Sequence, residues 1–81
     1  MNIYDYITSI LQEDKIIKKN YHFYRTENRI NNLHLQTTFL FINNKSAIVR
    51  VTFSNEQLDN FCRNKSYICI NNDGEKLLVN K

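Results

Sequence analysis

The chain opens with an apolar pattern of helical period. Apolar residues recur at intervals of three and four, which places them on one face of a helix: Ile3, Tyr6, Ile7, Ile10 and Leu11. Asn2 is suited to cap the N-terminus, and Asp5 lies in the first turn, where the helix dipole favours a negative charge. The pattern predicts a helix that ends near Asp14 and packs its apolar stripe on a sheet, because so short a helix is not stable alone.

From Lys19 onward the apolar period changes to two, as in half-buried strands. A first strand around residues 21–25 should end in a turn at 27–29. Residues 33–42 and 47–53 alternate in the same way on either side of Asn43-Asn44-Lys45, which predicts a hairpin with a three-residue loop. In that register apolar residues face each other across the strands: Phe41 with Ala47, Phe39 with Val49, Thr37 with Val51 and Leu35 with Phe53.

Ser54-x-x-Gln57 is a capping-box pattern, and it predicts a second, short helix with the apolar stripe Leu58, Phe61 and Cys62. A final hairpin should turn at Asp73-Gly74. It would then pair Ile70 with Leu77 and Ile68 with Val79. The order helix, three strands, short helix, two-stranded hairpin predicts one α+β domain over residues 1–81, with an antiparallel sheet and helices packed on one face.

Composition narrows the function classes. With 81 residues, 42% of them hydrophobic, the chain can form one small core but not a pair of domains. The sequence has neither a signal-peptide pattern at its start nor an apolar run long enough for a membrane span. Cys62 and Cys69 are too few for a disulfide scaffold and too far apart for a C-x-x-C motif. We therefore expect a cytoplasmic protein whose two thiols are free and packed in the structure.

Chemistry-bearing motifs are missing from the sequence. His22, His34, Cys62 and Cys69 lack the spacing of metal ligands, although His22 and His34 fall on adjacent predicted strands and could be neighbours. No pair of carboxylates suggests acid–base catalysis, and one glycine cannot form a phosphate-binding loop. We expect no metal, no cofactor and no enzymatic activity. A compact nuclease-like enzyme using His22, His34 and Tyr24 is the weakest alternative.

Cations lie beside aromatic rings early in the chain, as in proteins that bind single strands: Lys15, Lys18, Lys19, Tyr21, Arg25 and Arg29. The net charge of +3 allows contact with nucleic acid without requiring it. Glu13, Asp14 and Glu27 interrupt the positive run, so we expect weak and non-specific binding. A small nucleic-acid-binding accessory or regulatory protein is the alternative function.

The predicted central hairpin carries apolar residues on both faces near its loop. Leu40, Ile42 and Ile48, called here the first apolar patch, lie on the face opposite to Phe39 and Phe41. One explanation is a protein–protein contact with a second copy or a target, rimmed by Tyr24 and Arg50. The other is that a helix or the last hairpin covers this face and makes a second core layer.

The opening Met1-Asn2-Ile3-Tyr4-Asp5-Tyr6-Ile7, the Lys-rich strand after it and the helix–three strands–helix order resemble small phage-encoded inhibitors of Cas nucleases over residues 1–63. The resemblance implies a non-enzymatic protein of a phage or other mobile element. Such a protein would inhibit a host protein, such as a CRISPR or other defence nuclease, by direct contact in the bacterial cytoplasm. The DNA mimicry of acidic inhibitors does not carry over to this basic chain. The abundance of residue types with AT-rich codons agrees with a phage origin.

Overall fold

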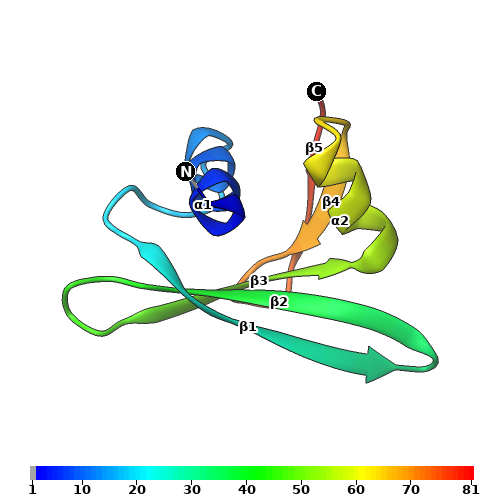
Figure 1. Ribbon diagram of the computed structural model, residues 1–81, viewed down its shortest axis with the longest axis horizontal. Coiled ribbons are helices and arrows are strands. Elements are labelled where there is room, and N and C mark those ends of the chain that lie inside the picture. The colour runs from blue at the N-terminus through cyan, green and yellow to red at the C-terminus, as the bar shows by residue number, and fades with distance from the viewer. Residues whose placement is uncertain (1) are drawn as a thin grey trace.

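The computed structural model describes residues 2–81, and the order of its elements is the predicted one (Figure 1). The five strands form one antiparallel sheet in the order β1-β2-β3-β4-β5, which confirms the α+β prediction. The elements are α1 (Ile3–Glu13), β1 (His22–Asn31), β2 (His34–Ile42), β3 (Ile48–Ser54), α2 (Asn55–Cys62), β4 (Tyr67–Ile70) and β5 (Lys76–Val79).

Both helices begin where the sequence predicts. The Asn2 side chain accepts a hydrogen bond from the Asp5 amide at 2.9 Å, and Ser54 Oγ accepts one from the Gln57 amide at 3.2 Å. The capping box is only half formed, because the Gln57 side chain does not return to Ser54. Its Oε1 accepts from the Ile68 amide at 2.9 Å and so ties α2 to β4.

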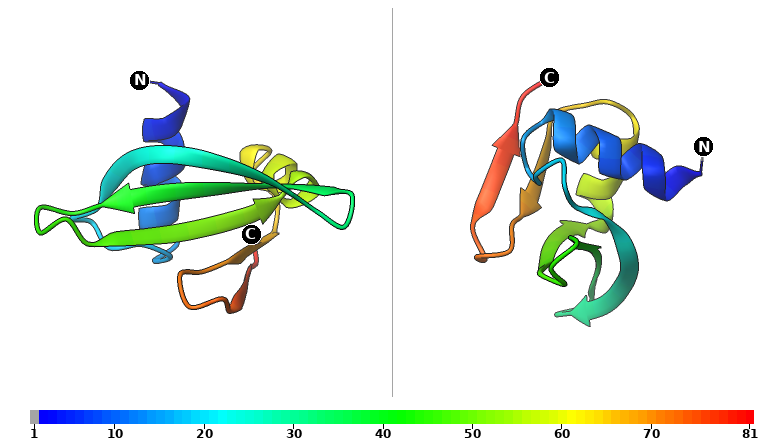
Figure 2. Two further views of the ribbon diagram at one scale, coloured as in Figure 1. Left: turned by 90° about the horizontal axis from the view of Figure 1, so that it is seen from below. Right: turned by 90° about the vertical axis from the view of Figure 1, so that its left-hand side faces the viewer.

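Strands β1 to β3 form a layer with both helices on one side (Figures 1 and 2). The β4–β5 hairpin stands on that same side, facing α1, because β3 and β4 share a single residue pair, Thr52 with Ile70. We call the side of the β1–β3 layer that no helix covers the open side. The core fills the space between the layer, the two helices and the β4–β5 hairpin.

Phe53 lies at the centre of this core. Its ring centroid is 5.0 Å from that of Phe61 and 5.9 Å from those of Phe39 and Tyr67. These tilted and edge-on contacts join β2, β3, α2 and β4. The buried side chains of the core come from α1, the segment after it, β2, β3, α2 and β4, and β1 and β5 add partly buried ones: Ile7, Leu11, Ile17, Phe39, Phe41, Val51, Phe53, Phe61, Tyr67 and Cys69 are buried.

The β2–β3 and β4–β5 loops are built alike. Both are longer than predicted, so the two predicted strand registers are wrong. Loops 43–47 and 71–75 each have five residues. In each, the first Asn side chain accepts two backbone amides: Asn43 from Lys45 and Ala47, and Asn71 from Asp73 and Glu75. The fourth residue has a positive φ, 63° at Ser46 and 83° at Gly74. The Asn side chain thus adds to the backbone bonds that close each loop, from Ser46 to Asn43 and from Gly74 to Asn71.

The longer loops shift the pairing by different amounts. Strands β2 and β3 pair Phe41 with Val49 and Phe39 with Val51, two residues from the predicted register, so each side chain keeps its face. Strands β4 and β5 pair Cys69 with Leu77, one residue away, so the faces exchange. As a result Ile68 and Leu78 lie opposite each other on the outer face, 40% and 63% exposed.

Strand β1 also differs from its prediction. It continues through 27–29, where the sequence predicts a turn, and the chain reverses at Asn32 and Leu33 instead. The register shifts between Phe23 and Arg25, which makes Tyr24 the extra residue of a β-bulge. The bulge places Tyr24 beside Arg25, whose guanidinium carbon lies 5.6 Å from the Tyr24 ring centroid.

Candidate functional site

The first apolar patch is not an exposed surface, which corrects one sequence expectation. Leu40 is 1% exposed, and Ile42 and Ile48 are half-buried. The alternative of a covering helix or last hairpin is also wrong, because both helices and the β4–β5 hairpin stand on the other side of β1–β3. Leu40 sits on the middle strand, level with Arg25 on one side and Arg50 on the other. The methylene stems of such long side chains can shield an apolar neighbour.

Exposed apolar residues gather instead at the far end of the β1–β2 hairpin, which sequence reasoning missed. Ile30, Leu33 and Leu35 are 75%, 97% and 43% exposed, and we call them the apolar hairpin end. Ile30 and Leu35 are directly opposite each other, on the same face as Phe39. Figure 1 shows that the hairpin reaches past α2 here, and only Leu35 of the three lines a hollow with the start of α2 at Asn55 and Glu56.

The turn of this hairpin has an unusual backbone. Asn32 and Leu33 have φ of 50° and 67°, which is the two-residue turn that fits the twist of paired strands. Asn tolerates this conformation, whereas a bulky side chain such as leucine rarely adopts it. A leucine that is both strained and almost wholly exposed contributes nothing to the core. Such a residue is typical of a functional contact.

The cations and tyrosine of the predicted nucleic-acid site are divided by the fold. Lys15, Lys18 and Lys19 lie exposed in the segment between α1 and β1, while Tyr21 is half-buried against the core. By the strand register, Arg25 and Arg29 lie on the open side. Arg50, predicted as part of a protein-contact rim, also lies there and is exposed, as is Tyr24 at its bulge. The open side therefore combines residues from both predicted sites.

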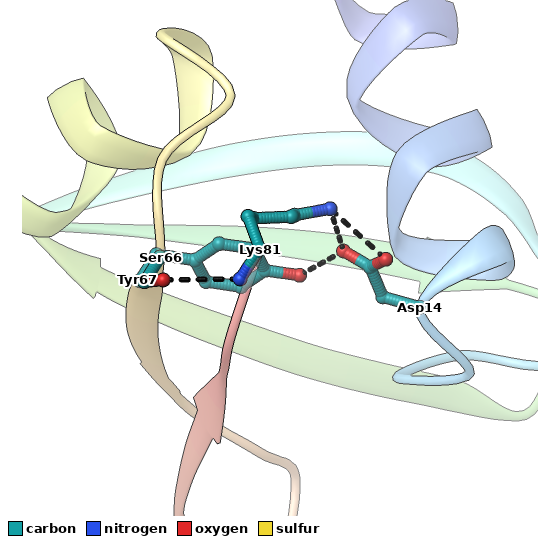
Figure 3. A network of polar contacts seen from close by, with 4 residues as sticks. All are labelled: Asp14, Ser66, Tyr67 and Lys81. Carbon is teal, nitrogen blue, oxygen red and sulfur yellow. Dashed lines mark hydrogen bonds and ion pairs between the residues drawn. The ribbon is translucent and has the colours of Figure 1, made fainter.

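A polar cluster that the sequence did not reveal joins the end of α1 to the β4–β5 hairpin (Figure 3). Lys81 Nζ lies 3.1 and 2.9 Å from the two Asp14 carboxylate oxygens, and the Tyr67 hydroxyl donates to the same carboxylate. The Lys81 amide donates to Ser66 Oγ at 3.0 Å. Burial and the bond to Asp14 raise the pKa of Tyr67. Because every member has its partner, the cluster serves to hold the β4–β5 hairpin against the end of α1.

The two cysteines are free thiols in different surroundings. Cys69 is buried in the core, and this burial raises its pKa to about 11. Cys62 is exposed at the end of α2, so its expected core packing is wrong; desolvation and the nearby Asp59 raise its pKa. His22 pairs with Ile42 and His34 with Asn31, at opposite ends of the β1–β2 ladder, so the two histidines are not neighbours. Within residues 2–81 no three metal-ligating side chains cluster.

A shallow hollow lies between the α1–β1 segment, β3 and the 71–75 loop. Its lining mixes Ile16, Tyr21 and Val49 with Arg50 and Asp73. These groups do not converge on a point where a substrate atom could react. Among residues 2–81 no helix is long and apolar enough to cross a bilayer. Comparison of the chain with protein-family models, curated proteins and solved structures finds no match in any of the three.

Proposed function

We propose that this is a non-enzymatic binding protein that acts by direct contact with another protein through the apolar hairpin end. The observation that carries the proposal is the exposure of Ile30, Leu33 and Leu35 on a hairpin that projects beyond the core. Burying one such side chain against a partner is worth about 1.5–3 kcal/mol, and three in one place can anchor an interface.

The strained turn supports the same proposal. Substituting glycine for Leu33 would relieve the positive φ and remove apolar surface from water, so the leucine is unfavourable for the free chain on both counts. A partner with an apolar cleft supplies a reason to keep it. The neighbouring polar groups Asn32 and His34, both exposed, would form the rim of the contact.

The resemblance to phage-encoded inhibitors suggests the class of target. We propose a CRISPR or other defence nuclease of a bacterial host, met in the cytoplasm by a protein of phage origin. A chain without a converging set of catalytic groups would inhibit such a nuclease by occupying its surface.

The test separates the contact from the fold by means of Leu33→Gly. We expect this variant to keep or raise the melting temperature by up to a few degrees, since strain of about 1 kcal/mol is removed. It should lose at least tenfold in affinity for the target, measured as inhibition of DNA cleavage by a purified Cas nuclease. The matched control is Leu78→Ser, which removes another exposed leucine, on β5, and should inhibit as the natural chain does. Equal inhibition by both variants would rule out the hairpin end as the contact, and absence of inhibition by the natural chain would rule out this target.

A further inference from the structure

Charge is divided unequally between the two sides of the β1–β3 layer. Apart from the side chains that β1–β3 turn to the open side, the chain carries eight cations and seven carboxylates, which nearly cancel. The open side holds Arg25, Arg29 and Arg50, and its one carboxylate on β1–β3 is Glu27. A modest net charge of +3 thus becomes a basic surface on one side of the molecule.

The three arginines are spread over the surface and do not meet at one point. Arg25 and Arg50 are both level with Leu40, two strand spacings or about 10 Å apart. Arg29 lies four residues further along β1, about 13 Å from Arg25. Glu27 lies between Arg25 and Arg29 on β1, and level with it on β2 and β3 are the hydroxyls of Thr38 and Thr52, 2.8 Å apart. Separated cations with polar groups between them fit an extended chain of anions better than a single small anion.

An exposed aromatic ring belongs to the same surface. Tyr24, 50% exposed, is placed beside Arg25 by the bulge. A ring next to a guanidinium group offers a face on which a nucleobase can stack while its phosphate is neutralised.

The open side is poorly suited to a tight protein interface. The centre of such an interface is apolar and well packed. Here Leu40 is already buried within the chain, and Ile42 and Ile48 are half-buried. Binding to a phosphate backbone requires no apolar centre, because its free energy comes from counterions released by cations.

We infer that the open side binds the phosphate backbone of a single-stranded nucleic acid through Arg25, Arg29 and Arg50, with Tyr24 as a stacking platform. This activity is independent of the contact proposed for the apolar hairpin end. Of the lysines in the predicted basic segment, Lys18 lines the same hollow as Arg50, whereas Lys15 and Lys19 do not. Two carboxylates moderate the affinity: Glu27 pairs with Arg25 at 3.2 Å, and Asp73 lines the same hollow as Arg50.

Fluorescence anisotropy with a fluorescein-labelled oligothymidylate 20-mer tests this inference. Three phosphate contacts predict a slope of log affinity against log salt of about −2, hence a loss of about 15- to 20-fold between 50 and 200 mM. The variant R25A/R29A/R50A should bind more than tenfold more weakly at 50 mM and lose most of the salt dependence. The matched control K15A/K19A/K65A changes net charge by the same amount at three exposed lysines in the segments after α1 and α2, and it should stay within threefold of the natural chain.

Two further measurements keep the outcome clear. Glu27→Gln leaves every arginine in place and frees Arg25, so it should raise the affinity; circular dichroism confirms that each variant is folded. Equal weakening by both triple variants would mean that net charge alone acts and would overturn the inference. So would a natural chain that does not bind, or competition by poly-glutamate as strong as that by unlabelled oligothymidylate at equal charge.

Discussion

Apolar and polar side chains alternate in the same way in the β2–β3 hairpin and at the free end of the β1–β2 hairpin. The apolar side chains are buried in the first region and exposed in the second. Phe39 and Phe53 are almost wholly buried, while Ile30 and Leu35, on the same face, are 75% and 43% exposed. The two regions differ in which other elements pack on their apolar face. Helices and the β4–β5 hairpin cover the first, whereas the second extends past α2 (Figure 1). Alternation selects the face of a strand, but coverage by other elements decides whether that face is core.

The largest expected effect contrasts these two regions directly. Phe53→Ala removes the ring that touches Phe39, Phe61 and Tyr67, so it should lower the free energy of unfolding by about 3–5 kcal/mol. Leu35→Ala at the free end should change it by no more than about 0.5 kcal/mol. Urea denaturation followed by circular dichroism measures both. Similar losses for the two variants would show that the free end is part of the core.

An alkaline titration sharpens the contrast between the buried and exposed thiols. Burial raises the pKa of Cys69 from 9.0 to about 11, so the folded chain keeps a proton that the unfolded chain releases. The contribution of this thiol to the free energy of unfolding should therefore be constant below pH 9. Between pH 9 and 11 the free energy of unfolding should fall by about 2–3 kcal/mol, because each pH unit in this range costs about 1.4 kcal/mol. The raised pKa of Tyr67 acts in the same direction.

Denaturation at several pH values compares the natural chain with two variants. Cys69→Ala should lose most of the fall between pH 9 and 11, whereas Cys62→Ala should retain most of it because Cys62 is exposed. If Cys62→Ala flattened the curve and Cys69→Ala did not, the placement of the two thiols would be reversed.

The smallest effect compares two ion pairs. Asp14 and Lys81 are mostly buried, with 15% and 25% of their side chains exposed, and they hold the β4–β5 hairpin against α1. Asp14→Asn should cost about 1–3 kcal/mol, since Lys81 loses its counter-charge. Asp59 and Arg63 form an exposed pair at 3.2 Å, and Asp59→Asn should cost less than about 0.5 kcal/mol. Thermal unfolding of both variants checks this, and equal melting temperatures would show that the Asp14 cluster does not stabilise the fold.

The sequence predicted the elements well where local rules dominate. The amphipathic helix with its Asn2 cap, the second helix after Ser54 and the alternation of β2 and β3 all follow from short-range spacing. The β1–β2 turn was wrong because Glu27-Asn28-Arg29 looks like a turn, while Asn32-Leu33 lacks the usual glycine. Both other hairpin loops begin with Asn-Asn, but so does the β1–β2 reversal at Asn31-Asn32, so this dipeptide marks the turns without giving their lengths.

By itself the sequence determined which residues are helical or extended, except at 27–29, and which face of β2 and β3 packs on the core, because these depend mainly on neighbours a few residues apart. Only the tertiary structure decided that Leu40 is buried and Leu33 exposed, because burial depends on elements distant in the chain. It also brought Arg50 level with Arg25 and joined Asp14 to Lys81, pairs separated by many residues in the sequence. The candidate surfaces follow from that placement, because a strand's register and a sheet's uncovered side exist only once the strands have paired and the helices have packed.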